Sequence, residues 1–182
     1  MLNKSVARRY AEAFFSIARE AGKIDDYQNE LGKIVQTIEE VADLKQYFAH
    51  PLSPTKDKKE IAKQLFASEV SSVTLNFLLL VLDKKRQTYL ELIYKEYVDM
   101  ADESRNIKKA ELISAMAVSD EDIQTLSETL SKSTGKTIQL KLSVDPSMIG
   151  GVKIRMGDKI IDASVAKKLE MLKKNLKTAK IS

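Results

Sequence analysis

Residues 148–165 read MIGGVKIRMGDKIIDASV and hold three of the six glycines of a 182-residue chain. After the paired glycines, apolar and basic residues alternate, and this period of two is typical of a strand with one buried face. Gly157 and Asp158 then supply the central residues of a tight turn, so Ile154 and Ile161 are expected to pair across a hairpin. The stretch therefore predicts β-structure near the C-terminus.

A phosphate-binding loop is the alternative explanation of these glycines. Such a loop has the pattern G-x-x-x-x-G-K-[ST], in which the glycines free backbone N–H groups and the lysine reaches the phosphates. Here five residues separate Gly151 from Gly157, and Asp158 occupies the place of the lysine, where its charge would repel a phosphate. We therefore interpret Gly157 as a turn residue, and Gly150 and Gly151 as sites of close backbone packing or a bulge.

The sequence around the hairpin predicts a small mixed α/β domain. Residues 107–116 are compatible with a strand, and residues 138–144 alternate cleanly between apolar and polar side chains. Between them, Ser119 and Asp122 form a Ser-x-x-Asp helix start. A last helix is expected after Ser164, with leucines on one stripe and lysines opposite.

The first 105 residues instead carry helical periodicity and no convincing strand. In the first helix, expected over residues 3–21, apolar side chains cover an arc of about 200°, about twice what one packing seam needs. The run FLLLVL at 77–82 is apolar on every side and predicts a helix at the centre of a bundle. Ser53 is the expected cap of the preceding helix, and Ser71 or Ser72 the cap of this one.

The change of period near residue 105 predicts an α+β chain in two domains. An all-helical bundle is expected over residues 1–105, and the mixed α/β domain over residues 106–182. The longest apolar run has about ten residues, against the ~20 that a membrane-spanning helix needs. No membrane-spanning segment or secretion signal is therefore predicted, and the chain is expected to work in the cytosol.

Composition argues against several kinds of chemistry. The chain has no cysteine and a single histidine, His50, so thiolate sites, histidine metal clusters and Ser-His relays lack their residues. Paired carboxylates lie at helix ends and connections, where solvated acids are expected rather than catalytic groups with shifted pKa values. No cofactor, metal or catalytic residue is predicted.

The net charge of +4 is concentrated at the C-terminus. Residues 163–182 contain six lysines and one glutamate, whereas the rest of the chain is nearly neutral. Three interpretations of the last helix stay open: a solvated face opposite a core stripe, contact with an acidic protein helix, or contact with a membrane surface or nucleic acid. Nucleic acid fits poorly, because residues 106–182 contain one arginine and no aromatic side chain.

Two stretches make the chain resemble a known family. VARRYAEAFFSIA at 6–18 is similar to the first helix of the delta subunits of F-type ATP synthases, whose mitochondrial counterpart is the oligomycin-sensitivity-conferring protein. IGGVKIRMGDKIIDASVAKKLEML at 149–172 is similar to that family's paired glycines, apolar-basic alternation, Gly-Asp and Asp-x-Ser. The resemblance extends over the whole chain, although the chain lacks the tryptophan that some members have in the N-terminal domain.

The resemblance implies a stator protein without an active site of its own, which links the catalytic head to the peripheral stalk. Its N-terminal domain would be a six-helix bundle that binds the N-terminal helix of an alpha subunit in a groove between the first and fifth helices. The family match assigns that groove to Tyr10, Ala13, Ile17, Leu79 and Leu80. The C-terminal domain would bind the C-terminal helices of the b subunits. Candidate contacts are Lys167, Lys168 and Lys174.

The same resemblance implies a peripheral position on the cytoplasmic face of a bacterial cell membrane, held there only through the complex. The excess apolar arc of the first helix fits a docking groove, but it could equally pack against other helices of the bundle. The rival hypotheses are a nucleic-acid-associated helical protein that uses the basic last helix, and an uncharacterised enzyme. Neither has a motif in the sequence.

Overall fold

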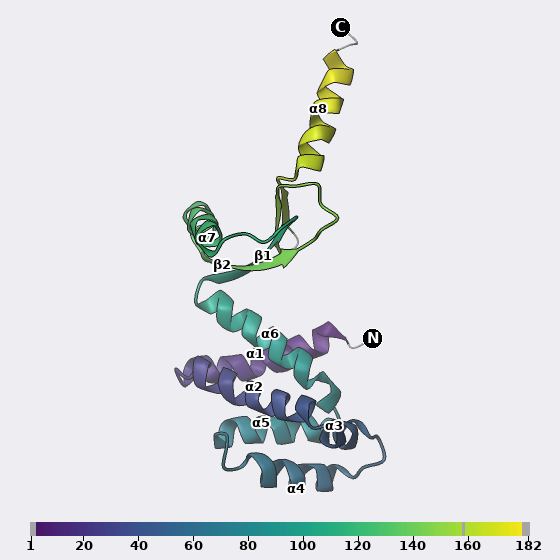
Figure 1. Cartoon of the computed structure of the whole chain (residues 1–182). Coiled ribbons are helices and arrows are strands. Elements are labelled where there is room, and N and C mark those ends of the chain that lie inside the picture. The colour runs from purple at the N-terminus through teal and green to yellow at the C-terminus, as the bar shows by residue number, and fades with distance from the viewer. Residues whose placement is uncertain (1–2, 158, 180–182) are drawn as a thin grey trace. The chain divides into compact units, whose positions relative to one another are not determined.

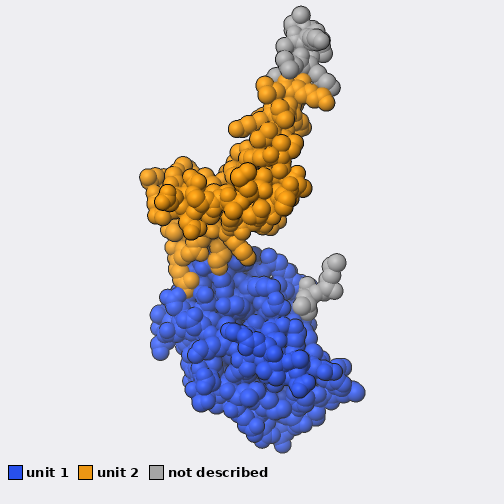
Figure 2. Space-filling model, viewed as in Figure 1, with its two compact units in different colours: residues 1–102 blue, residues 103–182 orange. Residues whose placement is uncertain are grey.

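The computed structural model describes residues 3–157 and 159–179, with side chains as far as residue 174. The chain divides into two compact units, unit 1 over residues 1–102 and unit 2 over residues 103–182 (Figure 2). The division falls in the last turn of helix α6 (Leu90–Ser104), close to the change of period near residue 105. Each unit has its own hydrophobic core.

The regular elements described in unit 1 are all helical, as the 3.6-residue period predicts (Figure 1). The elements that come before α6 are α1 (Lys4–Glu20), α2 (Ile24–Glu40), α3 (Ala42–Ala49), α4 (Thr55–Phe66), α5 (Ser72–Asp83) and the short 3-10 helix η1 (Gln87–Tyr89).

The helix starts agree only partly with the sequence prediction. Ser71 caps α5, since its hydroxyl accepts the Thr74 N–H at 3.4 Å. The prediction of Ser53 as the cap of α4 was wrong. Pro54 occupies that position with φ −58°, and its ring has no oxygen to accept an N–H. The N-terminus of α4 therefore has no side-chain cap.

The core of unit 1 is organised around Phe14 of α1. Its ring is fully buried and stacks on Phe77 of α5 at 4.3 Å between centroids. It also stacks on Tyr27 of α2 at 5.6 Å and meets Tyr97 of α6 at 5.4 Å. The Tyr97 hydroxyl donates to the Ile24 carbonyl at 3.0 Å, which satisfies this otherwise buried polar group. One aromatic cluster thus joins four helices.

A buried lysine holds the end of the short helix α3. The Lys58 ammonium donates to the Phe48 carbonyl at 2.8 Å and to the His50 carbonyl at 2.7 Å, groups that a helix C-terminus leaves without backbone partners. Burial lowers the pKa of Lys58, and the charge of Lys85 lowers it further. The His50 side chain is exposed, and its Nδ1 accepts the Leu52 N–H at 3.3 Å.

The described residues of unit 2 form a four-stranded mixed sheet and two helices (Figure 1). The elements, in chain order, are β1 (Ile107–Ser114), α7 (Asp120–Thr134), β2 (Thr137–Val144), β3 (Val152–Met156), β4 (Lys159–Asp162) and α8 (Val165–Ala179). The strand order is β2-β1-β3-β4, with β1 parallel to β2 and the other neighbours antiparallel.

The predicted hairpin is formed by β3 and β4. Ile154 pairs with Ile161, as the sequence predicts. Gly157 has φ +59°, in the left-handed region that favours glycine, whereas Asp158 lies outside the described residues. The parallel pairing of β1 with β2 was not predicted. It follows from the helix α7 that connects these strands as a β-α-β crossover.

Helix α7 covers one face of the sheet and one of its edges. The core under α7 contains Leu112, Ile138 and Ile154, all at most 5% exposed. At the outer edge of β2, the Ser131 hydroxyl accepts the Ile138 N–H at 2.9 Å, and the Ser127 hydroxyl donates to the Ile138 carbonyl. These serines satisfy backbone groups that an edge strand otherwise leaves without partners.

Candidate docking surfaces

Helix α1 has an apolar surface wider than its core contacts need. The face turned to the core is formed by Ala7, Ala11, Phe14 and Ala18, which are fully buried. On the neighbouring stripe Tyr10 is half-buried, Ala13 is exposed and Ile17 is 46% exposed. Residues spaced by three and four positions lie on the same side of a helix. The excess of apolar arc seen in the sequence is therefore left at the surface.

Helix α5 shows the same division between an inner and an outer face. Its inner face buries Thr74, Phe77, Leu78, Val81 and Leu82. Leu79 is half-buried, and Leu80 is 47% exposed. The prediction that this helix lies at the centre of the bundle therefore holds only for its inner face.

The stacked rings of Phe14 and Phe77 place α1 and α5 next to each other. Ile17 follows Phe14 by three residues on α1, and Leu80 follows Phe77 by three residues on α5. Each exposed side chain therefore lies about one helical turn away from the stacked rings. We call the set Tyr10, Ala13, Ile17, Leu79 and Leu80 the α1-α5 surface. The five residues come from the sequence prediction, and the structure leaves each of them at least partly exposed.

The sequence prediction left out two half-buried valines beside these residues. Val6 precedes Tyr10 by one turn on α1, and Val73 precedes Leu80 by two turns on α5. The signal was present in the spacing, because 6, 10, 13 and 17 follow the i, i+4, i+7, i+11 pattern of one helix stripe.

In unit 2, the glycine-rich stretch holds the start of α8. Gly151 has φ +80°, and a Cβ atom added to it would lie 2.6 Å from the Ala163 carbonyl oxygen. Its neighbour Gly150 accepts the Val165 N–H at 3.0 Å. Because the backbone of the hairpin approaches the first turn of α8 this closely, the paired glycines serve the fold, as the sequence predicts.

The Asp-x-Ser sequence at residues 162–164 forms the N-terminal cap of α8. The Asp162 carboxylate accepts the Ser164 N–H at 2.9 Å, and the Ser164 hydroxyl accepts the Lys167 N–H at 3.2 Å, which caps α8. Hydrogen bonds from the hydroxyl and the N–H of Ser164 hold the pKa of Asp162 below its usual range.

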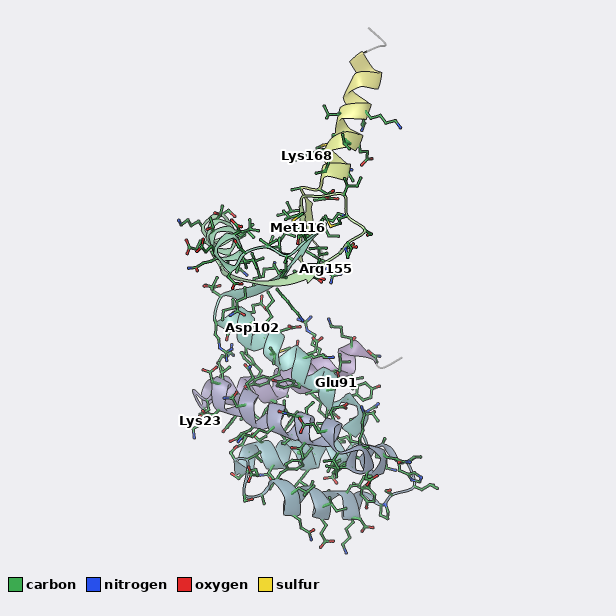
Figure 3. All side chains as sticks on the ribbon, viewed as in Figure 1. Lys23, Glu91, Asp102, Met116, Arg155 and Lys168 are labelled. Carbon is green, nitrogen blue, oxygen red and sulfur yellow. The ribbon has the colours of Figure 1, made fainter. Side chains whose placement is uncertain are left out.

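Helix α8 presents both of its predicted faces at the surface. Lys167, Lys168 and Lys174 are exposed, and Figure 3 marks Lys168 on this helix. Lys167 pairs with Glu170 at 2.7 Å, and that hydrogen bond and charge raise the pKa of Lys167.

The apolar stripe of α8 is also exposed, with Leu169 at 54% and Leu172 at 57%. The interpretation of this helix as a solvated face opposite a core stripe therefore fails, because the stripe is not buried. A helix with an uncovered apolar stripe has a surface suited to a partner.

Two structural features are absent among the described residues. Among them there is no group of three or more His, Cys, Asp or Glu side chains placed to hold a metal ion, and no helix long and apolar enough to cross a membrane. The carboxyl pKa shifts found here are downward and are caused chiefly by hydrogen bonds. These lowered pKa values belong to Glu91, Asp145, Asp162 and Glu170.

Each of the two units thus leaves an apolar helix surface exposed, which is typical of proteins that bind other chains. The sequence profile of the ATP synthase delta (OSCP) subunit family matches residues 6–176. The chain therefore belongs to the ATP synthase delta (OSCP) subunit family. Its function is that of a stator subunit in the peripheral stalk of an F-type ATP synthase. The family resemblance noted from the sequence is confirmed.

Individual relatives agree with this membership. The chain is 63% identical over 182 residues to the ATP synthase subunit delta of Syntrophomonas wolfei, and the match covers 100% of both chains. It is 41% identical over 181 residues to the ATP synthase subunit delta of Desulforudis audaxviator, again over 100% of both. A chain in the mitochondrial ATP synthase hexamer of Toxoplasma gondii has the same fold, with TM-score 0.70, 18% identity, and coverage of 93% of this chain and 96% of that one.

Proposed function

We propose that the chain joins the two ends of the stator, unit 1 holding the catalytic head and unit 2 holding the peripheral stalk, without catalysing a reaction itself. The observation that carries this proposal is the presence of an exposed apolar helix surface on each unit. The chain would be held at the cytoplasmic face of the bacterial membrane only through the complex. Co-purification of the tagged chain with the head and stalk subunits from membranes tests the proposal, and loss of either group would contradict it.

Unit 1 binds the N-terminal helix of an alpha subunit on the α1-α5 surface. The exposed Ile17 and Leu80 side chains would be covered by the apolar face of that helix. Burying one such side chain contributes about 1.5 to 3 kcal/mol, and nanomolar affinity needs about 12 kcal/mol in total. Several apolar side chains on this surface, together with those of the partner, can supply that free energy and also offset the entropic cost of association.

The substitution Ala13→Asp tests this surface. We expect it to weaken binding of a labelled alpha N-terminal peptide at least about tenfold, because the bound complex would bury an unpaired carboxylate. Since Ala13 is exposed in the free chain, the circular dichroism spectrum should stay unchanged. Fluorescence anisotropy measures the affinity.

Ala42→Asp provides the matched control. Ala42 is exposed on α3, and the substitution adds the same charge away from α1 and α5. It should bind the peptide as the unaltered chain does. Equal affinities of Ala13→Asp and the unaltered chain would reject the assignment of the α1-α5 surface.

Unit 2 binds the C-terminal helices of the b subunits, and the basic face of α8 contributes to this contact. The exposed Lys167, Lys168 and Lys174 would attract acidic residues of those helices. Exposed charges are screened within ~10 Å at 0.1 M salt and ~3 Å at 1 M.

We therefore expect affinity for a peptide from the C-terminal end of the b chain to fall as salt rises from about 0.05 to 0.5 M. Exposed ion pairs contribute about 0.2 to 1 kcal/mol each, so replacing the three lysines by alanine should weaken low-salt binding about tenfold and flatten the salt dependence. Isothermal titration calorimetry at several salt concentrations measures both effects. A salt-independent affinity of the unaltered chain would argue against the contribution of α8.

A further inference from the structure

Unit 1 contains a pocket that is separate from the α1-α5 surface. Its walls come from α2, α3, η1 and the start of α6, and none of the residues described on them belongs to that surface. The pocket has a volume of about 170 Å³. It therefore concerns a part of the bundle that neither of the two docking surfaces uses.

The inner wall of this pocket is apolar. It is formed by Val35 and Ile38 of α2, Phe48 of α3 and Leu90 of α6, each at most 8% exposed. In other proteins a cavity of about 150 Å³ with an apolar lining binds one benzene molecule. The pocket of unit 1 therefore has room for one six-membered aromatic ring with one or two small substituents.

One polar side chain interrupts the apolar wall. The Nε2 group of Gln87 donates to the Phe48 carbonyl at 3.0 Å, and the Lys58 ammonium donates to the same carbonyl at 2.8 Å. These contacts fix the orientation of the Gln87 amide, because the opposite orientation would bring its oxygen against the carbonyl oxygen. Among the described residues, the buried Oε1 atom of Gln87 has no hydrogen-bond partner.

This oxygen gives the pocket a preference for a ligand with a hydrogen-bond donor. A buried acceptor without a partner costs free energy, and a donor on the ligand would recover it. Small-molecule sites usually combine apolar walls with a few fixed polar groups that orient the ligand. In this pocket the Gln87 amide is such a group, and it accepts rather than donates.

The charged residues at the mouth of the pocket favour an uncharged ligand. Glu39, Lys45 and Glu91 line the pocket and are exposed, and Figure 3 marks Glu91 near the start of α6. The Lys45 ammonium donates to Glu39, and Lys95 pairs with Glu91 at 2.6 Å. Each carboxylate thus already has a lysine partner. A charged ligand would lose its hydration at the apolar wall and find no unpaired charge in exchange.

We propose that this pocket binds a small uncharged aromatic molecule with one hydroxyl or N–H donor, of which phenol is the simplest example. The ring lies against Val35, Ile38 and Leu90, and the donor bonds to the Gln87 Oε1 atom. This site goes beyond the proposed function, which needs no small-molecule ligand. Because its walls come from four elements, a bound molecule stabilises their packing in unit 1.

Nuclear magnetic resonance of the full-length chain tests the location, with phenol as the probe. We expect saturable binding, with nuclear Overhauser effects between the ring protons of phenol and the methyl groups of Val35, Ile38 and Leu90. Benzoate has the same ring with a negative charge and should bind at least about tenfold more weakly. If phenol gives no such effects at these methyl groups, or if benzoate binds equally well, the proposal is overturned.

The substitution Gln87→Met tests the acceptor. Toluene is the matched probe, because it has the size of phenol but no donor. In the variant the phenol hydroxyl would be buried without a partner, so the affinity for phenol should fall about tenfold relative to that for toluene. Retained toluene binding shows that the pocket is intact, and the Phe48 carbonyl keeps its bond to Lys58.

Gln64→Met provides the control, because Gln64 is exposed on α4 and the substitution makes the same change outside the pocket. It should leave the affinities for phenol and toluene unchanged. If Gln87→Met changes both affinities by the same factor, the amide oxygen is not the acceptor and the proposal is overturned. The nuclear Overhauser effects in the unaltered chain test the location of the ligand independently of any variant.

Discussion

Replacing Phe14 by alanine is expected to lower the free energy of unfolding of unit 1 by about 3 to 5 kcal/mol. The ring is fully buried and contacts the aromatic rings of three other helices, so its loss leaves a cavity where Phe77, Tyr27 and Tyr97 meet. Domains of this size have total stabilities of about 5 to 15 kcal/mol. The loss is therefore a large fraction of what holds the helices together. Urea denaturation followed by circular dichroism measures it.

The neighbouring phenylalanine provides the control. Phe15 is half-buried, and its ring meets Tyr97 at 5.6 Å. Since less of its surface leaves water on folding, Phe15→Ala should cost about 1 to 2 kcal/mol. Equal losses for the two variants would show that the aromatic cluster is not centred on Phe14.

Replacing Gly151 by alanine is expected to lower the free energy of unfolding of unit 2 by about 2 to 4 kcal/mol. Two effects add. At φ +80° any Cβ is strained, and here it would also lie 2.6 Å from the Ala163 carbonyl oxygen and 2.9 Å from Ser164 Cα. Both contacts are with backbone, so no side-chain rotation relieves them. Thermal unfolding and hydrogen exchange of the unit 2 amides measure the effect.

Gly157→Ala separates the two effects. Gly157 also has a positive φ, of +59°, but a Cβ there would meet nothing within 4 Å. We expect this variant to cost only about 1 kcal/mol, the strain of the left-handed conformation alone. If Gly151→Ala is no worse than Gly157→Ala, the close approach of the hairpin to α8 does not constrain residue 151.

Periodicity was most informative where residues pack locally. The alternation at 152–156 and the turn after it predicted the Ile154–Ile161 pair, and the hydroxyls of Ser119 and Ser164 cap the helices that were expected after them. These features depend on neighbours a few residues away. Their physical causes are therefore contained in short stretches of sequence.

Features that depend on distant segments were less predictable. The wide apolar arc of α1 predicted two contact surfaces, but only the packing of Phe14 on Phe77 shows that Ala7 and Ala11 face the core and Ile17 faces out. The parallel pairing of β1 and β2 joins strands that are separated by a whole helix. For α8, the sequence could not tell whether the leucine stripe is covered, because covering depends on the rest of unit 2.

The two serines of α7 that bond to Ile138 also matter before the chain meets its partners. An exposed strand edge can be extended by the strand of another molecule, which is how sheets grow into fibrils. At β2, Ser127 and Ser131 bond to the carbonyl and the N–H of Ile138, two of the groups that such growth would use, and charged residues begin and end the four-residue strand β4 at the other edge. Both features oppose the polymerisation of a newly made molecule through its own sheet before it is incorporated into the complex.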